Sequence, residues 1–148
     1  MGYPSEYKRT NLGPSYFKLR KNTQGSALPA STDNLVLFDN VLSGTNDFYD
    51  VSTGTWISND GGKYIITVTL GLKSMVVADR MTIKLFYSGY QREQVDFNCC
   101  TGQMIGNCSF EVVADGAEYQ IYIWHNSAAD RLTTTGHDAT LSITRVSD

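Results

Sequence analysis

The sequence predicts an all-β fold built from two stacked sheets, and three observations support this prediction. Apolar residues alternate with polar residues at a period of two in many short segments. Turn-forming pairs that contain glycine separate these segments. No segment sustains the period of an amphipathic helix. Short strands that follow one another in this way form a sandwich or a barrel, because a parallel sheet would need helices between its strands.

The first strand is expected at 16–21, where apolar and basic residues alternate. Lys18, Arg20 and Lys21 have two interpretations: they are the solvent face of this strand, or they extend a basic segment that docks on a partner. The further strands are expected at 35–42, 55–58, 62–72, 79–88, 91–100, 104–113, 117–125, about 131–135, and 138–147. Ten short strands of this kind predict a two-sheet jelly roll.

The two clearest strands lie in the middle of the chain. In both, every second residue is apolar, at Tyr64, Ile66, Val68, Leu70, Met81, Ile83, Leu85 and Tyr87. Turns are expected at Ser43-Gly44, Thr53-Gly54, 59–62, Ser88-Gly89, Thr101-Gly102, Asp115-Gly116 and Thr135-Gly136. Such alternation places one face of each strand in a core and the other in solvent.

The 148 residues are expected to form a short arm and one domain. Residues 1–14 contain Pro4, Gly13 and Pro14 and lack strand alternation, whereas residues 15–148 are expected to be the jelly-roll domain. Residues 1–21 carry a net charge of +4, and the rest of the chain carries −7. A basic arm on an acidic body suggests a docking peptide. Its partner-binding residues are expected to be Tyr3, Tyr7, Lys8, Arg9 and Leu12.

Side chains that could carry catalysis are few and scattered. The histidines are His125 and His137, and their spacing from Cys99, Cys100 and Cys108 does not suggest a Cys–His nucleophile pair. An odd number of cysteines cannot form a complete disulfide framework, so reduced thiols are expected. No phosphate-binding or dinucleotide-binding motif occurs. We therefore expect no catalytic residues and no enzymatic activity.

No cofactor is expected, and calcium is the one ion that the loops could hold. The acidic loop residues concerned are Asp47, Asp50, Asp130 and Asp138. Isolated loop carboxylates are more often solvated than bound to a metal. The acidic body argues against nucleic acid as a partner. No apolar run approaches the length of a membrane span, and no secretory signal is visible.

Seven residues between positions 38 and 68 have a distinctive spacing. They are Phe38, Tyr49, Trp56, Gly62, Tyr64, Ile66 and Val68. The gaps between the first four are eleven, seven and six positions. This pattern resembles the globular-head family of complement component 1q. The sequence departs from that family's usual Phe or Tyr at Trp56, Ile66 and Val68, and from its usual Asn or Asp at Gly44.

The resemblance covers residues 15–148 and implies a ten-stranded jelly roll of the type shared with tumour necrosis factor. It also implies a homotrimer around an apolar three-fold axis. Trp56 and Tyr64 are large enough to fill the space between the sheets. Gly62 is expected to adopt a positive φ at the start of a long strand. The remaining aromatic residues, Tyr90 and Tyr122 among them, exceed what one core can hold. Two interpretations stay open: some of them line an oligomer interface, or the Tyr hydroxyls simply reach water.

Two functions agree with these expectations. The first is a trimeric structural protein of a phage or virus, a capsid decoration or head fibre, that docks at the virion surface through residues 1–14. Its partners would be further copies of itself and capsid or fibre proteins. The alternative is a receptor-binding or carbohydrate-recognising head, either on a tail fibre or as an extracellular recognition protein with a cell-surface glycan as partner. The lack of a visible signal peptide, a collagen stalk and a disulfide framework favours the first.

Overall fold

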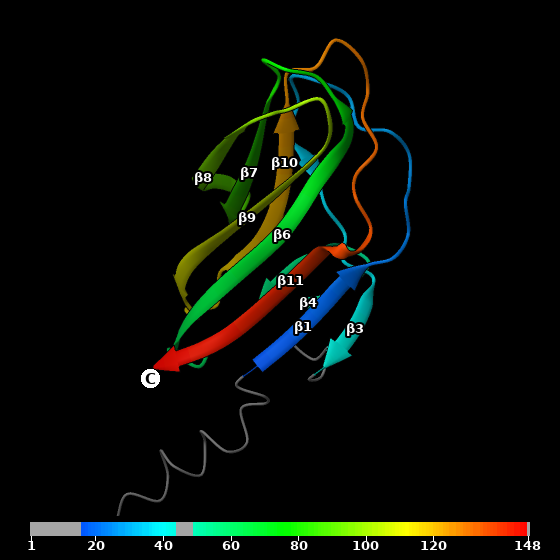
Figure 1. The fold of residues 1–148 in the computed structure, drawn as a ribbon. Helices are drawn as coiled ribbons and strands as arrows, with labels where there is room; N and C mark the ends of the chain where they lie inside the picture. The colour runs from blue at the N-terminus through cyan, green and yellow to red at the C-terminus, as the bar shows by residue number, and fades with distance from the viewer. Residues whose placement is uncertain (1–15, 44–48, 148) are drawn as a thin grey trace, which may run out of the picture.

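The computed structural model describes residues 16–43 and 49–147, which form two antiparallel β-sheets packed face to face (Figure 1). The expected all-β jelly roll is confirmed. Residues 1–14, the expected arm, lie outside the described residues. Within the described ranges there is no helix long and apolar enough to cross a membrane.

Several neighbouring strands in the two sheets come from distant parts of the chain. The five-stranded sheet has the order β3 (Asn40–Ser43), β1 (Tyr16–Lys21), β11 (Gly136–Ser147), β6 (Lys63–Met75) and β9 (Gly102–Val113). The six-stranded sheet has the order β4 (Tyr49–Asp50), β5 (Thr55–Ile57), β10 (Glu118–His125), β7 (Arg80–Tyr87) and β8 (Tyr90–Asn98), and β2 (Asn34–Leu35) pairs with β10. The first strand therefore lies beside the last one, inside the five-stranded sheet, whose edges are β3 and β9.

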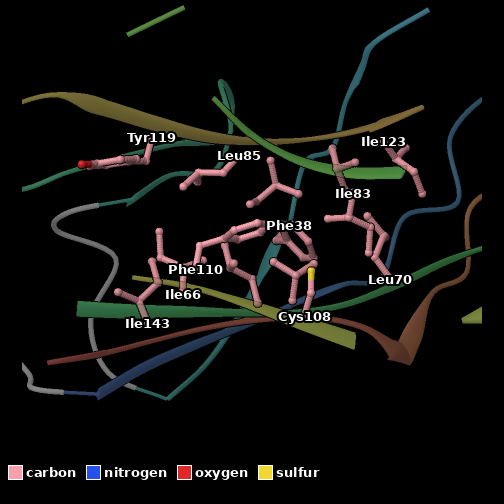
Figure 2. Packing of buried hydrophobic residues seen from close by; sticks show 14 of the residues in the cluster. Phe38, Ile66, Leu70, Ile83, Leu85, Cys108, Phe110, Tyr119, Ile123 and Ile143 are labelled. Carbon is pink, nitrogen blue, oxygen red and sulfur yellow. The ribbon is translucent and has the colours of Figure 1, made fainter. Parts of the chain in front are cut away.

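One core fills the space between the sheets (Figure 2). Ile66 and Phe110 reach it from the five-stranded sheet, and Ile83, Leu85 and Tyr119 reach it from the six-stranded sheet. Burial of each such side chain stabilises the fold by about 1.5–3 kcal/mol. The predicted alternation is present along the strands because the two sheets bury one face each.

The segment 35–42, expected to be one strand, contributes to both sheets instead. Leu35 pairs with Tyr122 of β10, whereas Val41 pairs with Leu19 of β1. Between these pairings Val36 and Phe38 are buried in the core. Burial alternates as far as Asp39 and then stops, because Asn40 and Val41 are both half-buried. Apolar residues stand on both sides of Asp39-Asn40, so the sequence alone suggests one strand.

The expected strand at 131–135 is wrong. Arg131 and Thr133 form only isolated bridges, with Leu28 and Leu72 respectively. Its backbone bonds to the loop residue Leu28 at Arg131 and to Gly71 and Lys73 of β6 at residues 132–134, so no single partner pairs with it over its length. The short strand β4 was not expected, because a two-residue strand carries no periodic signal.

Gly62 does not have the expected positive φ. That conformation belongs to Gly61, with φ of 76°. Gly62 is needed for a different reason: a Cβ at this position would lie 2.8 Å from the Arg145 guanidinium. The pair of glycines thus combines a left-handed turn residue with a site of close side-chain approach.

The basic residues of β1 divide between the two faces of the sheet. Lys18 and Arg20 lie on the outer side and are half-buried, as the solvent-face interpretation expects. Lys21 has the inward parity of Phe17 and Leu19 and is 9% exposed. The solvent-face interpretation is therefore wrong for Lys21.

Candidate interaction surface

The outer face of the five-stranded sheet carries uncharged side chains, most of them hydroxyl-bearing, along β11 and β6. The outward pairs between β11 and β6 are Thr144 with Ile65, Ser142 with Thr67, and Thr140 with Thr69. All six residues are half-buried. The absence of charge from these two strands, over the three rows, is typical of the centre of a protein–protein interface.

The rows continue onto β9, where polar groups bond to one another. Thr67 lies opposite Ser109, and their hydroxyl oxygens are 3.0 Å apart. Asn107 Nδ2 donates a hydrogen bond to Thr69 Oγ1 at 2.8 Å. Because these groups already have partners across the strands, another surface can cover them at a smaller desolvation cost.

Charged residues stand at the two sides of this face. Lys18 and Arg20 lie on β1, opposite Ser142 and Thr140, whereas Glu111 lies on β9 at the other side. Arg20 Nε is buried without a hydrogen-bond partner among the described residues. One copy that turned its β9 side toward the β1 side of the next would bring an acid toward two bases. Such a head-to-tail contact closes into a ring when the rotation between copies permits it.

The outer face of the six-stranded sheet has a different chemistry, since it carries aromatic rings. The rings of Phe86 and Tyr122 lie side by side with centroids 4.1 Å apart. The Arg80 guanidinium lies over the Trp124 ring at 5.1 Å, within cation–π range. Beside these rings, Lys84 forms a salt bridge of 2.8 Å with the Asp33 carboxylate.

The residues of the motif at 38–68 hold the core together and present nothing to a partner. Phe38, Tyr49, Trp56, Tyr64, Ile66 and Val68 are all buried. The Trp56 and Tyr64 rings meet edge to face with centroids 5.0 Å apart. The Phe38 N–H donates to the Tyr49 hydroxyl at 3.3 Å. Burial raises the pKa of the Tyr49 phenol above its ordinary value.

Asp60 links the turn before β6 to the last strand. Its carboxylate accepts hydrogen bonds from the Gly62 N–H at 2.8 Å, from the Tyr64 hydroxyl, and from Arg145 Nη1 at 2.9 Å. Burial, together with the bond to Asp60, raises the pKa of Tyr64 to about 12. This cluster has a structural role, because the Asp60 carboxylate bonds to three groups of the fold itself.

His125 and the buried thiols have structural environments, whereas His137 is exposed beside Asp138. His125 is buried, with Nε2 2.9 Å from the Leu28 carbonyl oxygen, and its Nδ1 accepts from the Ser127 N–H at 3.3 Å. Burial raises the pKa of Cys99 and raises that of Cys108 to about 11. The thiolate, which is the nucleophile, is therefore disfavoured at both buried positions.

The loop carboxylates considered for calcium do not converge where they are described. In residues 16–43 and 49–147, no three His, Cys, Asp or Glu side chains gather in a group that could hold a metal. Asp50 Oδ1 accepts from the N–H and hydroxyl of Ser52, at 2.9 and 2.6 Å, and so stabilises its own turn. Asp47 lies outside the described residues.

Several solved structures share this arrangement. The globular domain of a zebrafish complement 1qA protein is 16% identical, with a TM-score of 0.59 over 87% of this chain and 94% of that one. Murine APRIL is 13% identical, with a TM-score of 0.59 over 88% of this chain and 98% of that one. Eiger TNF from S. frugiperda is 10% identical, with a TM-score of 0.60 over 90% of this chain and 92% of that one. The chain has the complement 1q and tumour necrosis factor fold.

At these low identities the likeness is one of fold. No protein-family model matches the chain. No curated protein matches it either. The expected partner-binding residues Tyr3, Tyr7, Lys8, Arg9 and Leu12 lie outside the described residues. Sequence reasoning also missed the outer face of the five-stranded sheet along β6 and β11, which we call the hydroxyl-rich face. Its signal is visible in the sequence: the outward positions of these two strands hold mostly Thr and Ser where an ordinary solvent face would hold Lys and Glu.

Proposed function

We propose that this chain is a non-enzymatic, homotrimeric binding head that assembles through the outer face of its five-stranded sheet. The observation that carries the proposal is the distribution of charge on that face. Its strands β11 and β6 are uncharged over three rows, while Lys18 and Arg20 stand on one side and Glu111 on the other. The uncharged centre of such a face can be desolvated when another copy covers it, and the charges at its sides can orient that copy.

The test is the mass of the protein in solution. Light scattering at micromolar concentration should give three times the chain mass of 16.4 kDa. Thr67→Arg places an unpaired charge at the centre of the face and should yield folded monomer. Gln91→Arg, an exposed position on β8, is the matched control and should stay trimeric. A monomeric parent protein would overturn the proposal.

We further propose that the trimer is a virion structural protein, either a capsid decoration or a head fibre, docked through residues 1–14. The support comes from the sequence. Tyr3, Tyr7 and Leu12 can enter apolar pockets of a particle, and Lys8 and Arg9 can meet an acidic rim. Three arms on one trimer bind together, so weak single contacts become strong through effective concentration.

Deletion of residues 2–14 tests this role. The truncated protein should keep its trimeric mass and its melting temperature, and it should no longer co-sediment with particles of the phage or virus. Reversal of Lys8 and Arg9 to Glu should weaken co-sedimentation most at low salt, because salt screens the contact. Co-sedimentation of the truncated trimer would contradict docking through the arm.

A second candidate function is recognition of a receptor or a glycan, and the aromatic face of the six-stranded sheet favours it. Phe86, Tyr122 and Trp124 provide ring surfaces against which the apolar faces of sugars can pack, and Lys84 and Asp33 provide polar groups beside them. Glycan binding that is lost in Trp124→Ala, with the trimer intact, would establish this role. Binding that is unchanged in Trp124→Ala would exclude this face.

A further inference from the structure

A cavity of about 410 Å³ lies beside the end of β1, where the loop after β1 passes the segment that follows β2. Its volume falls in the range of small-molecule sites. Lys21, Gln24 and Asp39 contribute polar groups to its lining. The apolar side chains that line it are Leu28, Leu35, Val36, Leu37 and Val51.

The apolar side of the cavity is entirely aliphatic among the described residues that line it. Among these lining residues Val36 is buried, whereas Leu35 and Leu37 are each 36% exposed. Because no ring is present to stack on a flat ligand, this wall suits a flexible hydrocarbon chain. Covering Leu35 and Leu37 would remove apolar surface that now faces solvent.

The polar side of the cavity contains a cation with neutral partners. Lys21 Nζ donates to the backbone carbonyl oxygens of Thr23 and Gln24, the latter at 3.1 Å. Burial lowers the pKa of Lys21, and the nearby Asp39 carboxylate opposes this effect. Burial deprives the Lys21 ammonium of solvent. An anion bound there would offset this cost with a charge-assisted hydrogen bond, which is stronger than a bond between neutral groups.

The neighbouring side chains are held in place. Gln24 Nε2 donates to the Thr133 carbonyl oxygen, and Gln24 Oε1 accepts from Lys73 Nζ at 2.9 Å. Asp39 Oδ1 accepts from the Asn22 N–H at 2.7 Å, and its other oxygen accepts from the Thr23 hydroxyl. The Asp39 charge is therefore partly compensated by the loop, and the polar side of the cavity is preorganised.

We infer that this cavity binds a medium-chain aliphatic carboxylate, with its chain along the leucine and valine wall and its carboxylate at Lys21 Nζ. No bond is formed or broken in this binding. The inference goes beyond the proposed assembly and docking roles, and it does not require either, since none of the lining residues belongs to residues 1–14 or to the outward rows of β6 and β11.

The test is titration of the full-length protein with decanoate, below its micelle concentration, followed by calorimetry. One saturable site per chain is expected. The matched ligand 1-decanol has the same chain without the charge, and it should bind at least about tenfold more weakly, as loss of a charged hydrogen bond predicts. Equal binding of the two ligands, or the absence of a saturable site, would overturn the inference.

Variants separate the two sides of the cavity. Lys21→Gln should weaken decanoate about tenfold and leave decanol unchanged, whereas Leu37→Ser should weaken both ligands. Lys63→Gln removes an exposed lysine of β6 and should leave both affinities unchanged. If Lys21→Gln fails to fold, as judged by circular dichroism, Leu37→Ser and the two-ligand comparison still decide. Decanoate affinity that is unaffected in Leu37→Ser would contradict the assigned position of the chain.

Discussion

The outer faces of the two sheets differ although the same strand alternation produces both. On the five-stranded sheet, Thr67 and Ser142 lie at the centre of an uncharged surface. On the six-stranded sheet, Phe86 packs on Tyr122, and Lys84 pairs with Asp33. Alternation decides which side chains face outward, whereas their chemistry decides what the face can contact. The first face suits a second copy of the chain, and the second suits solvent or a different ligand.

Both faces depend on the core between them, so the largest expected effect is there. Trp56→Ala and Tyr64→Ala each delete a buried ring and should each cost about 3–5 kcal/mol of unfolding free energy. Trp124→Ala removes a ring of the outer aromatic face and should cost about 1 kcal/mol. Chemical denaturation measures all three. Similar losses for Trp56 and Trp124 would show that the outer ring is also part of a core.

The charged residues at the sides of the hydroxyl-rich face should determine whether copies of the chain associate into a trimer. Exchange of both Lys18 and Arg20 for Glu should weaken trimer formation at least about tenfold, because like charges then approach at the contact. Adding Glu111→Lys should restore the trimer, and high salt should reduce both effects. Sedimentation gives the masses, with Lys84→Glu on the other sheet as the control. A trimer indifferent to all these changes would place the interface elsewhere.

Alkaline pH should destabilise the cluster formed by Asp60, Tyr64 and Arg145. The phenol of Tyr64 has a pKa raised from 10.0 to about 12, chiefly by burial. Because the unfolded chain loses this proton at lower pH than the folded one, this contribution is complete below pH 10 and is lost as pH rises toward about 12. Melting temperature should fall across this window, and the fall should be shallower in Tyr64→Phe. An identical slope in the variant would assign the effect to other groups.

The smallest effect should come from the aromatic face itself. A double-mutant cycle with Phe86→Leu and Tyr122→Leu should give a coupling free energy of about 0.5–1.5 kcal/mol, as expected for rings at this separation. The trimer should persist in both single variants, since this face lies on the other sheet. A change of mass in either variant would remove the distinction between the two faces.

Strand prediction from sequence succeeded where one segment with a clear apolar alternation stays in one sheet. The strand expected at 16–21 has the bounds of β1, because its alternation is matched to a single neighbouring strand on each side. The segment 35–42 is rich in apolar residues on both sides of Asp39-Asn40, and it was assigned to one strand where the chain changes sheets. Periodicity reports burial, and it does not report which strand supplies the hydrogen bonds.

The amino-acid sequence by itself determined the all-β class, most strand positions and the aromatic core around Trp56 and Tyr64, because these follow from local alternation and residue volume. Only the tertiary structure decided that Lys21 points inward, that Gly61 rather than Gly62 has the positive φ, and that the Thr and Ser residues of β6 and β11 form one surface. Each of these facts depends on contacts between residues far apart in the chain. Lys21 lies opposite Gly136 of β11, the Arg145 guanidinium approaches Gly62, and β6 pairs with β11.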